Sequence, residues 1–406
     1  MDKPYRLACL VTHPIQYQAP LFRYLSACPE IDLTVFFMND FSVRGYQDSG
    51  FGIKLSWDIP LLDGYKHIFL PAVLRRDSIS FWTPLVHGIY RQLKNGRFDA
   101  LWVNGYSHQA CLRSIAIAKF IGMKVLLRGE SHMKSHSRSE AKLFIKEKIL
   151  PKVFKSIDGF LAIGTLNRKY YLQYGVPERK IFMMPYAVDN DFFSGGAKKA
   201  ETSAEILRRQ LDLKVNRPVV LYASKLQARK RPRDLLEAYS RLSPNGVQEP
   251  EAYLLFIGDG EERSQLEAIA KKLGWSSVKF LGFKNQTELP SYYKLCDVFV
   301  LPSEHEPWGL VVNEVMNAGK PVILSDHVGC GPDLVQDGDN GFIVPVGDLK
   351  LLGDRLKQLV SNRELAGKMG EESLKRIGQW SFREDLEGLL YALERVINRR
   401  DESCGL

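Results

Sequence analysis

Two glutamates that flank a glycine are the residues of this chain whose types and spacing best suit chemistry. Glu306 and Glu314 are eight positions apart, and Gly309 lies between them at the predicted start of a short helix. The backbone N–H groups of Leu310 and Val311 would point outward there, and free donors at a helix start attract anions. At a rise of about 1.5 Å per residue the two carboxylates would lie roughly 12 Å apart, and carboxylates accept hydrogen bonds from sugar hydroxyls. This span suits a ligand with a diphosphate in its middle and a hydroxylated ring at each end, such as a nucleotide sugar.

The elements around this pair predict a strand–loop–helix–strand unit. An apolar strand at Val298–Leu301 leads into the loop, the helix ends at Gly319, and a Lys-Pro turn leads to a second buried strand at Val322–Ser325. Glycine is typical just after a helix end, and two parallel strands require such a crossover. The pattern therefore predicts a βαβ unit with the two glutamates in and after its first loop.

Together with Pro307, Gly309 and the Gly-x-Asn-Gly-Phe element at 338–342, the two glutamates resemble the Glu-x7-Glu signature of the retaining glycosyltransferases of family 4. The resemblance is dense over 157–348 and thin before residue 90, so it describes the donor side better than the acceptor side. It implies an α/β protein in which two Rossmann-like doubly wound domains face each other across a cleft, the GT-B arrangement. It also implies transfer of a sugar from a nucleotide diphosphate to an acceptor hydroxyl, with retention of configuration and without a metal or another cofactor.

The resemblance assigns roles to the charged residues. Glu306 would hold the hydroxyls of the donor sugar, and Glu314 would hold the ribose. Lys225 and Lys230 stand at the positions of the arginine and the lysine of the family's diphosphate clamp, so Glu306 and the two lysines are the predicted catalytic residues. Two fixed cations would stabilise a leaving diphosphate, whose negative charge grows as the sugar bond breaks. The other interpretation of the two lysines is a solvated basic loop.

Further donor contacts are predicted where strands end. Gly309, Leu310 and Val311 would meet the phosphates, and Gly258 follows a buried strand, where it permits close approach of a ligand to the backbone. Phe283 follows the next strand, which in the family runs beside the nucleobase. Its ring lines the base pocket or simply packs, and the sequence does not decide between the two.

The first half of the chain offers candidates for the acceptor side. His13 and Gln16 lie in the turn after the first strand, where the family usually has a glycine-rich turn, and ligands bind at strand carboxyl ends in doubly wound folds. They are acceptor or phosphate contacts, or His13 is an ordinary loop histidine. The family commonly has a histidine after a later strand, where this chain has Glu130. Glu130 is therefore a candidate, with His132 or the upstream His108 as compensation, and each of the three is equally consistent with a surface loop.

Length and the alternation of strands with helices predict the domain organisation. A chain of 406 residues exceeds one ordinary core. We expect an acceptor-side domain at 1–193, a nucleotide-sugar domain at 194–382 that opens with a small, polar linker at 194–204, and a last helix in 383–406 that crosses back to the first domain. Residues 40–90 read as irregular. The strands of the first half, whose alternation with helices predicts a parallel doubly wound sheet, are expected at 6–12, 32–38, 99–104, 124–128 and 157–163.

Composition favours an ordinary soluble globular protein, with 45% hydrophobic and 25% charged residues. Six scattered cysteines suit a reducing cytosol, no apolar run reaches the roughly 18 residues of a membrane span, and the first residues lack the apolar core of a signal peptide. We therefore expect a cytoplasmic protein. A net charge of +9 favours anionic partners, namely nucleotides, nucleic acid or acidic lipids, without choosing among them.

Residues 134–155 form a basic amphipathic segment, in which lysines and arginines alternate with apolar residues. Such a segment can contact a membrane surface, which would place the protein at the inner face of the membrane and suit a lipid-linked acceptor. A domain helix with a solvated basic face is the plainer interpretation.

Two functions from other classes also fit parts of the sequence. A sugar-nucleotide epimerase of the same architecture would turn over the donor without an acceptor. A basic, non-catalytic protein would bind nucleic acid in a steeply salt-dependent way, but the basic residues show no aromatic stacking platform. The expected partners are therefore a nucleotide sugar and a glycan or lipid-linked glycan of surface polysaccharide synthesis, and not nucleic acid.

Overall fold

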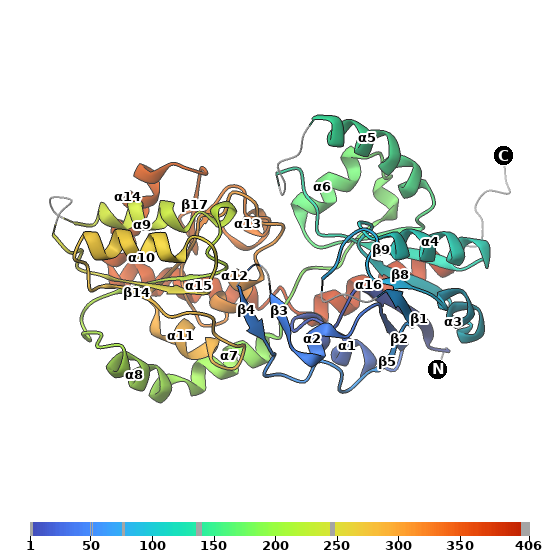
Figure 1. Ribbon diagram of the computed structural model, residues 1–406, viewed down its shortest axis with the longest axis horizontal. Helices are drawn as coiled ribbons and strands as arrows, with labels where there is room; N and C mark the ends of the chain where they lie inside the picture. Colours follow the sequence, from blue (N-terminus) through green and yellow to red (C-terminus); the bar gives the residue numbers. More distant parts are fainter. Residues whose placement is uncertain are drawn as a thin grey trace.

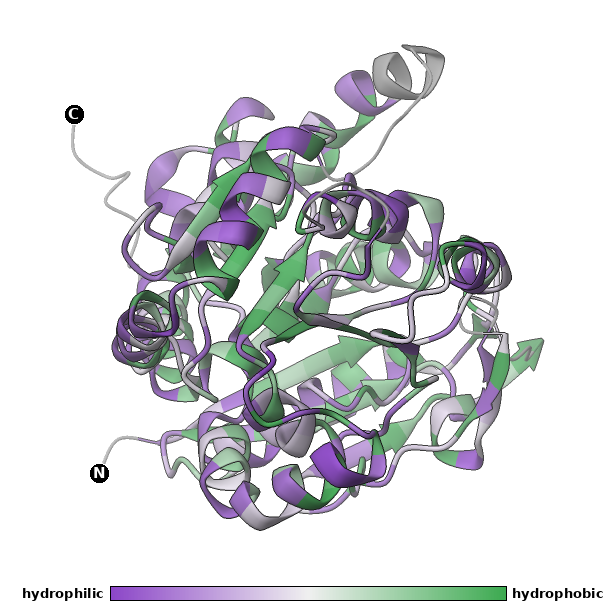
Figure 2. Cartoon of the chain, turned by 90° about the vertical axis from the view of Figure 1, so that its left-hand side faces the viewer, coloured by the Kyte–Doolittle hydropathy of each residue, from purple (hydrophilic) through white to green (hydrophobic). Residues whose placement is uncertain are grey.

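The computed structural model describes residues 3–398 except 49, 51, 75–77, 135–139 and 244–247, and within 140–145 it describes the backbone alone. Figure 1 shows two lobes, each built around one sheet. Both sheets are entirely parallel, and their strands are apolar while polar residues cover the outer helices (Figure 2). Strands that are buried on both faces appear in the sequence as continuous apolar runs. Such runs alternate with helical segments here, which explains why the sequence predicted both sheets.

The first sheet has seven strands whose order reverses between β1 and β8. In spatial order they are β11 (Ile181–Met183), β10 (Gly159–Ala162), β9 (Lys124–Arg128), β8 (Ala100–Asn104), β1 (Tyr5–Val11), β2 (Ile31–Phe37) and β5 (Lys66–Phe69). The helices of this lobe are α1 (Gln18–Ser26), α2 (Phe41–Arg44), α3 (Ile89–Gly96), α4 (Gln109–Phe120), α5 (Glu140–Lys155) and α6 (Thr165–Gln173).

The second sheet has six strands whose order reverses between β12 and β15. In spatial order they are β14 (Val278–Phe280), β13 (Tyr253–Ile257), β12 (Val219–Ala223), β15 (Val298–Leu301), β16 (Val322–Ser325) and β17 (Gly341–Val344). The predicted βαβ unit is confirmed, because α12 (Leu310–Met316) connects β15 to the parallel β16. The other helices are α9 (Pro232–Ser240), α10 (Arg263–Lys272), α11 (Leu289–Leu295), α13 (Gly331–Leu334), α14 (Leu349–Val360) and α15 (Arg363–Ile377).

The expectation that 40–90 is irregular is wrong in part. Strand β5 joins the first sheet beside β2, and two small antiparallel hairpins flank it in the sequence. These strands are short and partly exposed, so they lack the apolar run that marks a central strand. The hairpin strands are β3 (Tyr46–Asp48), β4 (Ile53–Leu55), β6 (Ala72–Leu74) and β7 (Leu85–Val86).

The residues of the predicted linker are helical. Helix α7 (Asn190–Lys199) spans the predicted boundary between residues 193 and 194, and α8 (Glu201–Gln210) follows it directly. Both pack on α11 of the second lobe. The last described helix, α16 (Phe382–Ile397), packs on β10, β11 and α1, so the chain returns to the first lobe (Figure 1).

Candidate active site

The carboxyl ends of β1, β12 and β15, three of the four strands at the two reversals of strand order, face one cavity of about 520 Å³ between the lobes. Doubly wound sheets bind ligands at this position, and the volume lies in the range of small-molecule sites. The cavity collects nearly all of the residues that the sequence predicted for the site: Glu306, Glu314, Lys225, Lys230, Gly309, Leu310, Val311, Gly258, Phe283, His13, Gln16 and Glu130.

Glu306 and Lys230 form a buried ion pair at the end of β15. The Glu306 carboxylate accepts a hydrogen bond from Lys230 Nζ, and both side chains are almost fully covered. Burial lowers the pKa of Lys230, and the carboxylate of Glu306 opposes that change. In the ligand-free protein, the cation predicted for the diphosphate is thus held by the carboxylate predicted for the sugar.

Glu314 lies on α12 and is bound by a tyrosine of the neighbouring helix. The hydroxyl of Tyr293 on α11 donates to Glu314 Oε2 at 2.5 Å. Burial raises the pKa of Glu314 to about 7, and the hydrogen bond from Tyr293 opposes the rise. Since Glu314 lines the cavity, its carboxyl group can accept from ligand hydroxyls when it is ionised.

Gly309 starts α12 with φ +96°, a conformation that side chains with a Cβ rarely adopt. A Cβ at this position would also lie 3.2 to 3.4 Å from Val328, Leu301 and Glu306. Trp308 fixes the turn, because its Nε1 donates to the Asn313 side chain at 2.9 Å. The backbone at the head of α12 is therefore held in place while it lines the cavity.

Lys225 belongs to the second lobe but pairs with the first. Its Nζ lies 2.7 Å from Oδ1 of Asp48, at the end of β3. Gly258, with φ +122°, packs beside the same loop, and a Cβ there would lie 2.0 Å from the Ser224 carbonyl oxygen. Only glycine fits at this position, because two backbone segments, at Gly258 and Ser224, pack closely against each other here.

Phe283 contacts an aromatic residue of the opposite lobe. Its ring centroid lies 6.1 Å from that of Trp57, at an interplanar angle of 69°. Next to them, Asn285 Nδ2 donates to the Ser56 carbonyl oxygen at 2.7 Å, and Thr287 N donates to Asp58 at 3.1 Å. Segment 56–58 thus closes one end of the cavity across the lobes.

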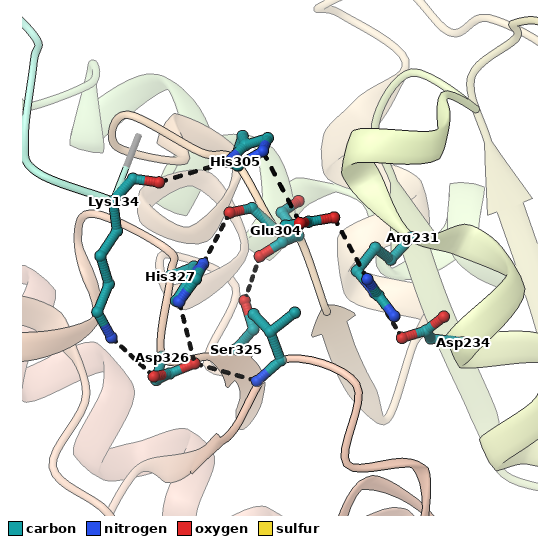
Figure 3. Close-up of polar contacts among 10 residues, drawn as sticks. Lys134, Arg231, Asp234, Glu304, His305, Ser325, Asp326 and His327 are labelled. Carbon is teal, nitrogen blue, oxygen red and sulfur yellow. Dashed lines mark hydrogen bonds and ion pairs between the residues drawn. The ribbon is translucent and has the colours of Figure 1, made fainter. Parts of the chain in front are cut away.

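Polar contacts also hold the outer side of the loop that carries Glu306, as Figure 3 shows. Glu304 Oε2 pairs with Arg231 Nη1 at 3.3 Å. His305 Nδ1 lies 3.3 Å from the carbonyl oxygen of Lys134 in the first lobe, and Lys134 Nζ pairs with Asp326 at 2.8 Å. The loop is thereby fixed to α9 on one side and to the first lobe on the other.

The predicted acceptor-side residues differ in their location and in their contacts. His13 and Gln16 form part of the first lobe's wall of the 520 Å³ cavity. The His13 ring packs on Phe41 at 4.4 Å, and burial lowers the pKa of His13 to about 4, so it is neutral at physiological pH. Glu130 accepts a hydrogen bond from the Tyr186 hydroxyl at 2.6 Å, and burial raises the pKa of Glu130.

The structure places His108 away from the other predicted site residues. His108 caps α4, where its Nδ1 accepts from the backbone N–H of Ala110 at 3.0 Å, and it lines neither of the two cavities at the cleft. His132 lies nearer, because its Nε2 donates to the Glu306 carbonyl oxygen at 3.0 Å. His132 of the first lobe therefore contacts the backbone of the loop that carries Glu306.

A second cavity of about 380 Å³ opens at the carboxyl ends of β1, β8 and β9. It shares Ile15, Glu130, Tyr186 and Pro307 with the larger cavity, so the two cavities lie next to each other there. Most of its lining residues carry no signal in the sequence, although Asn104 stands where a buried strand ends, a position that predicts ligand contact.

The described residues contain no group of three or more His, Cys, Asp or Glu side chains suited to a metal ion. None of the described helices is long and apolar enough to span a membrane. Of the basic segment at 134–155, residues 135–139 and the side chains of 140–145 lie outside the described part, and α5 covers most of the rest.

The fold and the cavity define the class: two Rossmann-like domains that face each other across a ligand cleft, the GT-B arrangement. Two solved structures share it over almost their whole length at 16% sequence identity. A glycosyltransferase from Rickettsia africae aligns with a TM-score of 0.75 over 98% of this chain and 100% of its own. The Anabaena protein HepE, in complex with UDP and glucose, aligns with a TM-score of 0.72 over 96% of this chain and 99% of its own.

The sequence then identifies the family of the second domain. Residues 203–376 match the family model of the glycosyl transferases group 1, which confirms the resemblance found around the two glutamates. The lipopolysaccharide core biosynthesis glycosyltransferase LpsE of Rhizobium meliloti is 34% identical over 43% of this chain and 49% of its own. The N-acetyl-alpha-D-glucosaminyl L-malate synthase of Bacillus anthracis is 31% identical over 42% of this chain and 43% of its own. The chain thus spans about half the length of these curated relatives.

Proposed function

We propose that the protein is a retaining glycosyltransferase, which moves a sugar, most simply a hexose, from a nucleotide-diphosphate donor to an acceptor hydroxyl. One observation carries the proposal: a single cavity between the domains gathers Glu306, Glu314, Lys225 and Lys230 around the turn at Gly309. The diphosphate would lie over the turn at Gly309, with the donor sugar at Glu306 and the ribose at Glu314. The group 1 match of the second domain supports the same donor class.

In the ligand-free site both lysines already have carboxylate partners, Glu306 for Lys230 and Asp48 for Lys225. A diphosphate brings its own negative charges, so donor binding would exchange the carboxylates for phosphate oxygens. The charge on the leaving phosphate grows in the transition state, and fixed cations stabilise that charge most strongly. This supports a reaction that draws its electrostatic catalysis from Lys225 and Lys230, without a metal ion.

Retention would follow from attack on the face that the diphosphate leaves. The bond between the anomeric carbon and the phosphate oxygen breaks, the acceptor oxygen bonds to the same carbon, and the acceptor proton passes to the departing phosphate oxygen. Isolation of a chemically competent covalent sugar–enzyme intermediate would contradict this course.

The test begins with calorimetry against a panel of nucleotide sugars, followed by a transfer assay with the one that binds. Glu306→Gln keeps the size of the side chain but removes its charge, and we expect transfer to fall below about 1% of wild type. Because Lys230 then stays buried without its anion, the unfolding midpoint should fall as well, so transfer is measured per folded protein. Turnover of the donor to an isomer without acceptor would favour the epimerase. Oligonucleotide binding without nucleotide-sugar binding would favour the nucleic-acid protein.

The acceptor and the cellular setting belong to the proposal as well. Curated relatives are named for acceptors as different as L-malate and D-inositol 3-phosphate, and LpsE is named for lipopolysaccharide core synthesis. We favour a glycan or lipid-linked glycan of a surface polysaccharide, met in the cytoplasm at the inner face of the membrane. Ile149 on α5 is 54% exposed, so its replacement by glutamate should weaken binding to anionic vesicles if α5 contacts lipid; unchanged sedimentation with vesicles would leave the solvated basic helix as the interpretation.

A further inference from the structure

The 380 Å³ cavity differs in chemistry from the cavity proposed for the donor. At the ends of β1, β8 and β9 its lining consists mainly of residues with polar side chains and of two glycines, and the described part of the lining contains no lysine or histidine. Its lining residues are Val11, Thr12, Ile15, Gln18, Asn104, Gly105, Tyr106, Ser107, Arg128, Gly129, Glu130, Ser131, Tyr186 and Pro307.

We infer that this cavity binds the acceptor as an uncharged, hydroxylated ring, a neutral sugar residue without phosphate or carboxylate. The inference rests on the proposed function, since it concerns the second substrate of the same reaction. The two cavities lie next to each other at Glu130, Tyr186 and Pro307, so an acceptor in the smaller one can present a hydroxyl to a donor sugar held in the larger one.

Arg128, the one cation among the described residues of the lining, already has a carboxylate partner. Arg128 pairs with Asp385 of α16 at 3.1 Å, and both side chains are buried. The same Nη2 donates to the carbonyl oxygens of Met184 and Pro185, and the guanidinium lies 5.1 Å from the centre of the Tyr186 ring. Because its charge is matched by Asp385, Arg128 adds no net positive charge to the cavity. Its Nε–H has no hydrogen-bond partner among the described residues and can donate to the oxygen of a neutral hydroxyl.

Among the described residues of the lining, Glu130 alone carries a carboxyl group, and as a carboxylate it would oppose an anion. Glu130 lies in the wall of both cavities, and it accepts a hydrogen bond from the Tyr186 hydroxyl. An acceptor phosphate or carboxylate would lose water beside this carboxylate and gain no unmatched cation, and burial of an unpaired charge is strongly unfavourable. A neutral ring avoids that cost, and its hydroxyls can both donate to Glu130 and accept from neighbouring groups.

The amide of Gln18 points to the same class of ligand. Gln18 is 9% exposed, and its Oε1 has no hydrogen-bond partner within the described part of the chain. This oxygen accepts hydrogen bonds only, as does an ionised phosphate or carboxylate, so the two cannot pair directly. A sugar hydroxyl can donate to it.

The test uses wild-type protein whose nucleotide-sugar donor has been found by calorimetry. Acceptors are offered as matched sets: the methyl glycosides of glucose, galactose and mannose, the corresponding 6-phosphates, and the corresponding uronic acids, at equal ionic strength. We expect kcat/KM to be at least about tenfold higher for the best neutral glycoside than for its charged counterparts. Preference for a charged member, or failure of every neutral glycoside both as acceptor and as ligand in a thermal-shift assay with bound nucleotide, would overturn the inference. Failure of all nucleotide sugars to bind would instead refute the proposed function.

A matched pair of variants separates the cavity from the fold. Gln18→Leu should raise the KM of the neutral acceptor roughly three- to tenfold, the effect of one lost hydrogen bond, and leave the donor KM unchanged. The control is Gln109→Leu, because Gln109 also starts a helix, is 6% exposed and has one unpartnered amide atom among the described residues, but lines neither cavity. Equal effects of the two variants on the acceptor KM would contradict the placement of the acceptor.

Discussion

Replacement of Glu314 by glutamine should stabilise the ligand-free protein at alkaline pH and weaken nucleotide binding. The structure buries this carboxyl group against Tyr293, and burial raises its pKa to about 7 from the ordinary 4.5. Glutamine has nearly the same shape and can still accept from the Tyr293 hydroxyl, but it cannot ionise. The substitution therefore removes the cost of a buried charge without opening a cavity.

The sign and size follow from proton linkage. Below pH 4.5 the folded and unfolded states both carry the proton, so Glu314 does not affect the pH dependence of folding. Between pH 4.5 and about 7 the folded state keeps a proton that the unfolded state has lost, so stability falls as pH rises. One pKa unit corresponds to about 1.4 kcal/mol, so the full loss above pH 7 is about 3 kcal/mol. Relative to wild type, the variant should gain under about 1 kcal/mol at pH 5 and about 3 kcal/mol at pH 8.

Binding should change in the opposite direction. Hydrogen bonds to a charged group contribute about 1 kcal/mol more than neutral ones, so at pH 8 the variant should bind the nucleoside diphosphate about fivefold more weakly. Wild-type affinity should rise as pH passes 7 and Glu314 ionises, whereas the affinity of the variant should not show that step. Urea unfolding and calorimetry at pH 5 and pH 8 measure both quantities.

The control is Glu304→Gln, in the same βαβ unit. Glu304 is 41% exposed, lies outside the cavity and pairs with the partly exposed Arg231, so its loss should cost at most about 1 kcal/mol. Parallel stability curves for wild type and Glu314→Gln between pH 5 and pH 8 would refute the reasoning about the buried carboxyl. An unchanged affinity would refute its contact with the ribose.

Three further substitutions test the charged pairs. Lys230→Ala should lower the affinity for nucleoside diphosphate at least about tenfold, and should also destabilise the protein because Glu306 stays buried without a cation; unchanged affinity in calorimetry would remove Lys230 from the diphosphate site. Asp48→Asn should raise that affinity about two- to fivefold, because Lys225 no longer exchanges a charged partner for phosphate, and weaker binding would contradict the exchange. Asp385→Ala leaves a buried guanidinium unmatched and should cost about 3–5 kcal/mol of unfolding free energy, and a loss below about 1 kcal/mol in urea unfolding would show that the pair is not buried in solution.

The two sheets could be predicted because their central strands can be recognised in the sequence. Val298–Leu301 and Val322–Ser325 are apolar and buried throughout, which is the pattern of parallel strands covered on both faces. Segment 194–204 is helical, although its glycines and small polar residues are typical of loops. Phe193 and Ala197 of α7 are nevertheless buried, and α7 packs on α11, so tertiary packing overrides the weak helix propensity.

The donor half of the site could be predicted because it lies within one contiguous stretch. The residues that pair with its charged side chains come from distant parts of the sequence. Tyr293 of α11 donates a hydrogen bond to Glu314, and Asp48, in a hairpin of the other domain, pairs with Lys225. Nothing in the local sequence links such distant pairs. The position of His108 could not be predicted for another reason. Histidine is not among the residues expected to cap a helix, although His108 Nδ1 caps α4 here.

The pairs Lys230–Glu306 and Lys225–Asp48 explain how two lysines can be held side by side in the wall of one cavity. A buried lysine without a partner would lose its proton or draw in water, and Lys230 already has a lowered pKa from burial. Glu306 and Asp48 supply negative charge from opposite domains and hold the two ammonium groups near their proposed positions before the donor arrives. The diphosphate then meets charges that need little reorganisation, which is the condition under which electrostatic stabilisation is most effective. Because Asp48 belongs to the first domain, its release from Lys225 by phosphate also couples donor binding to the contact between the domains.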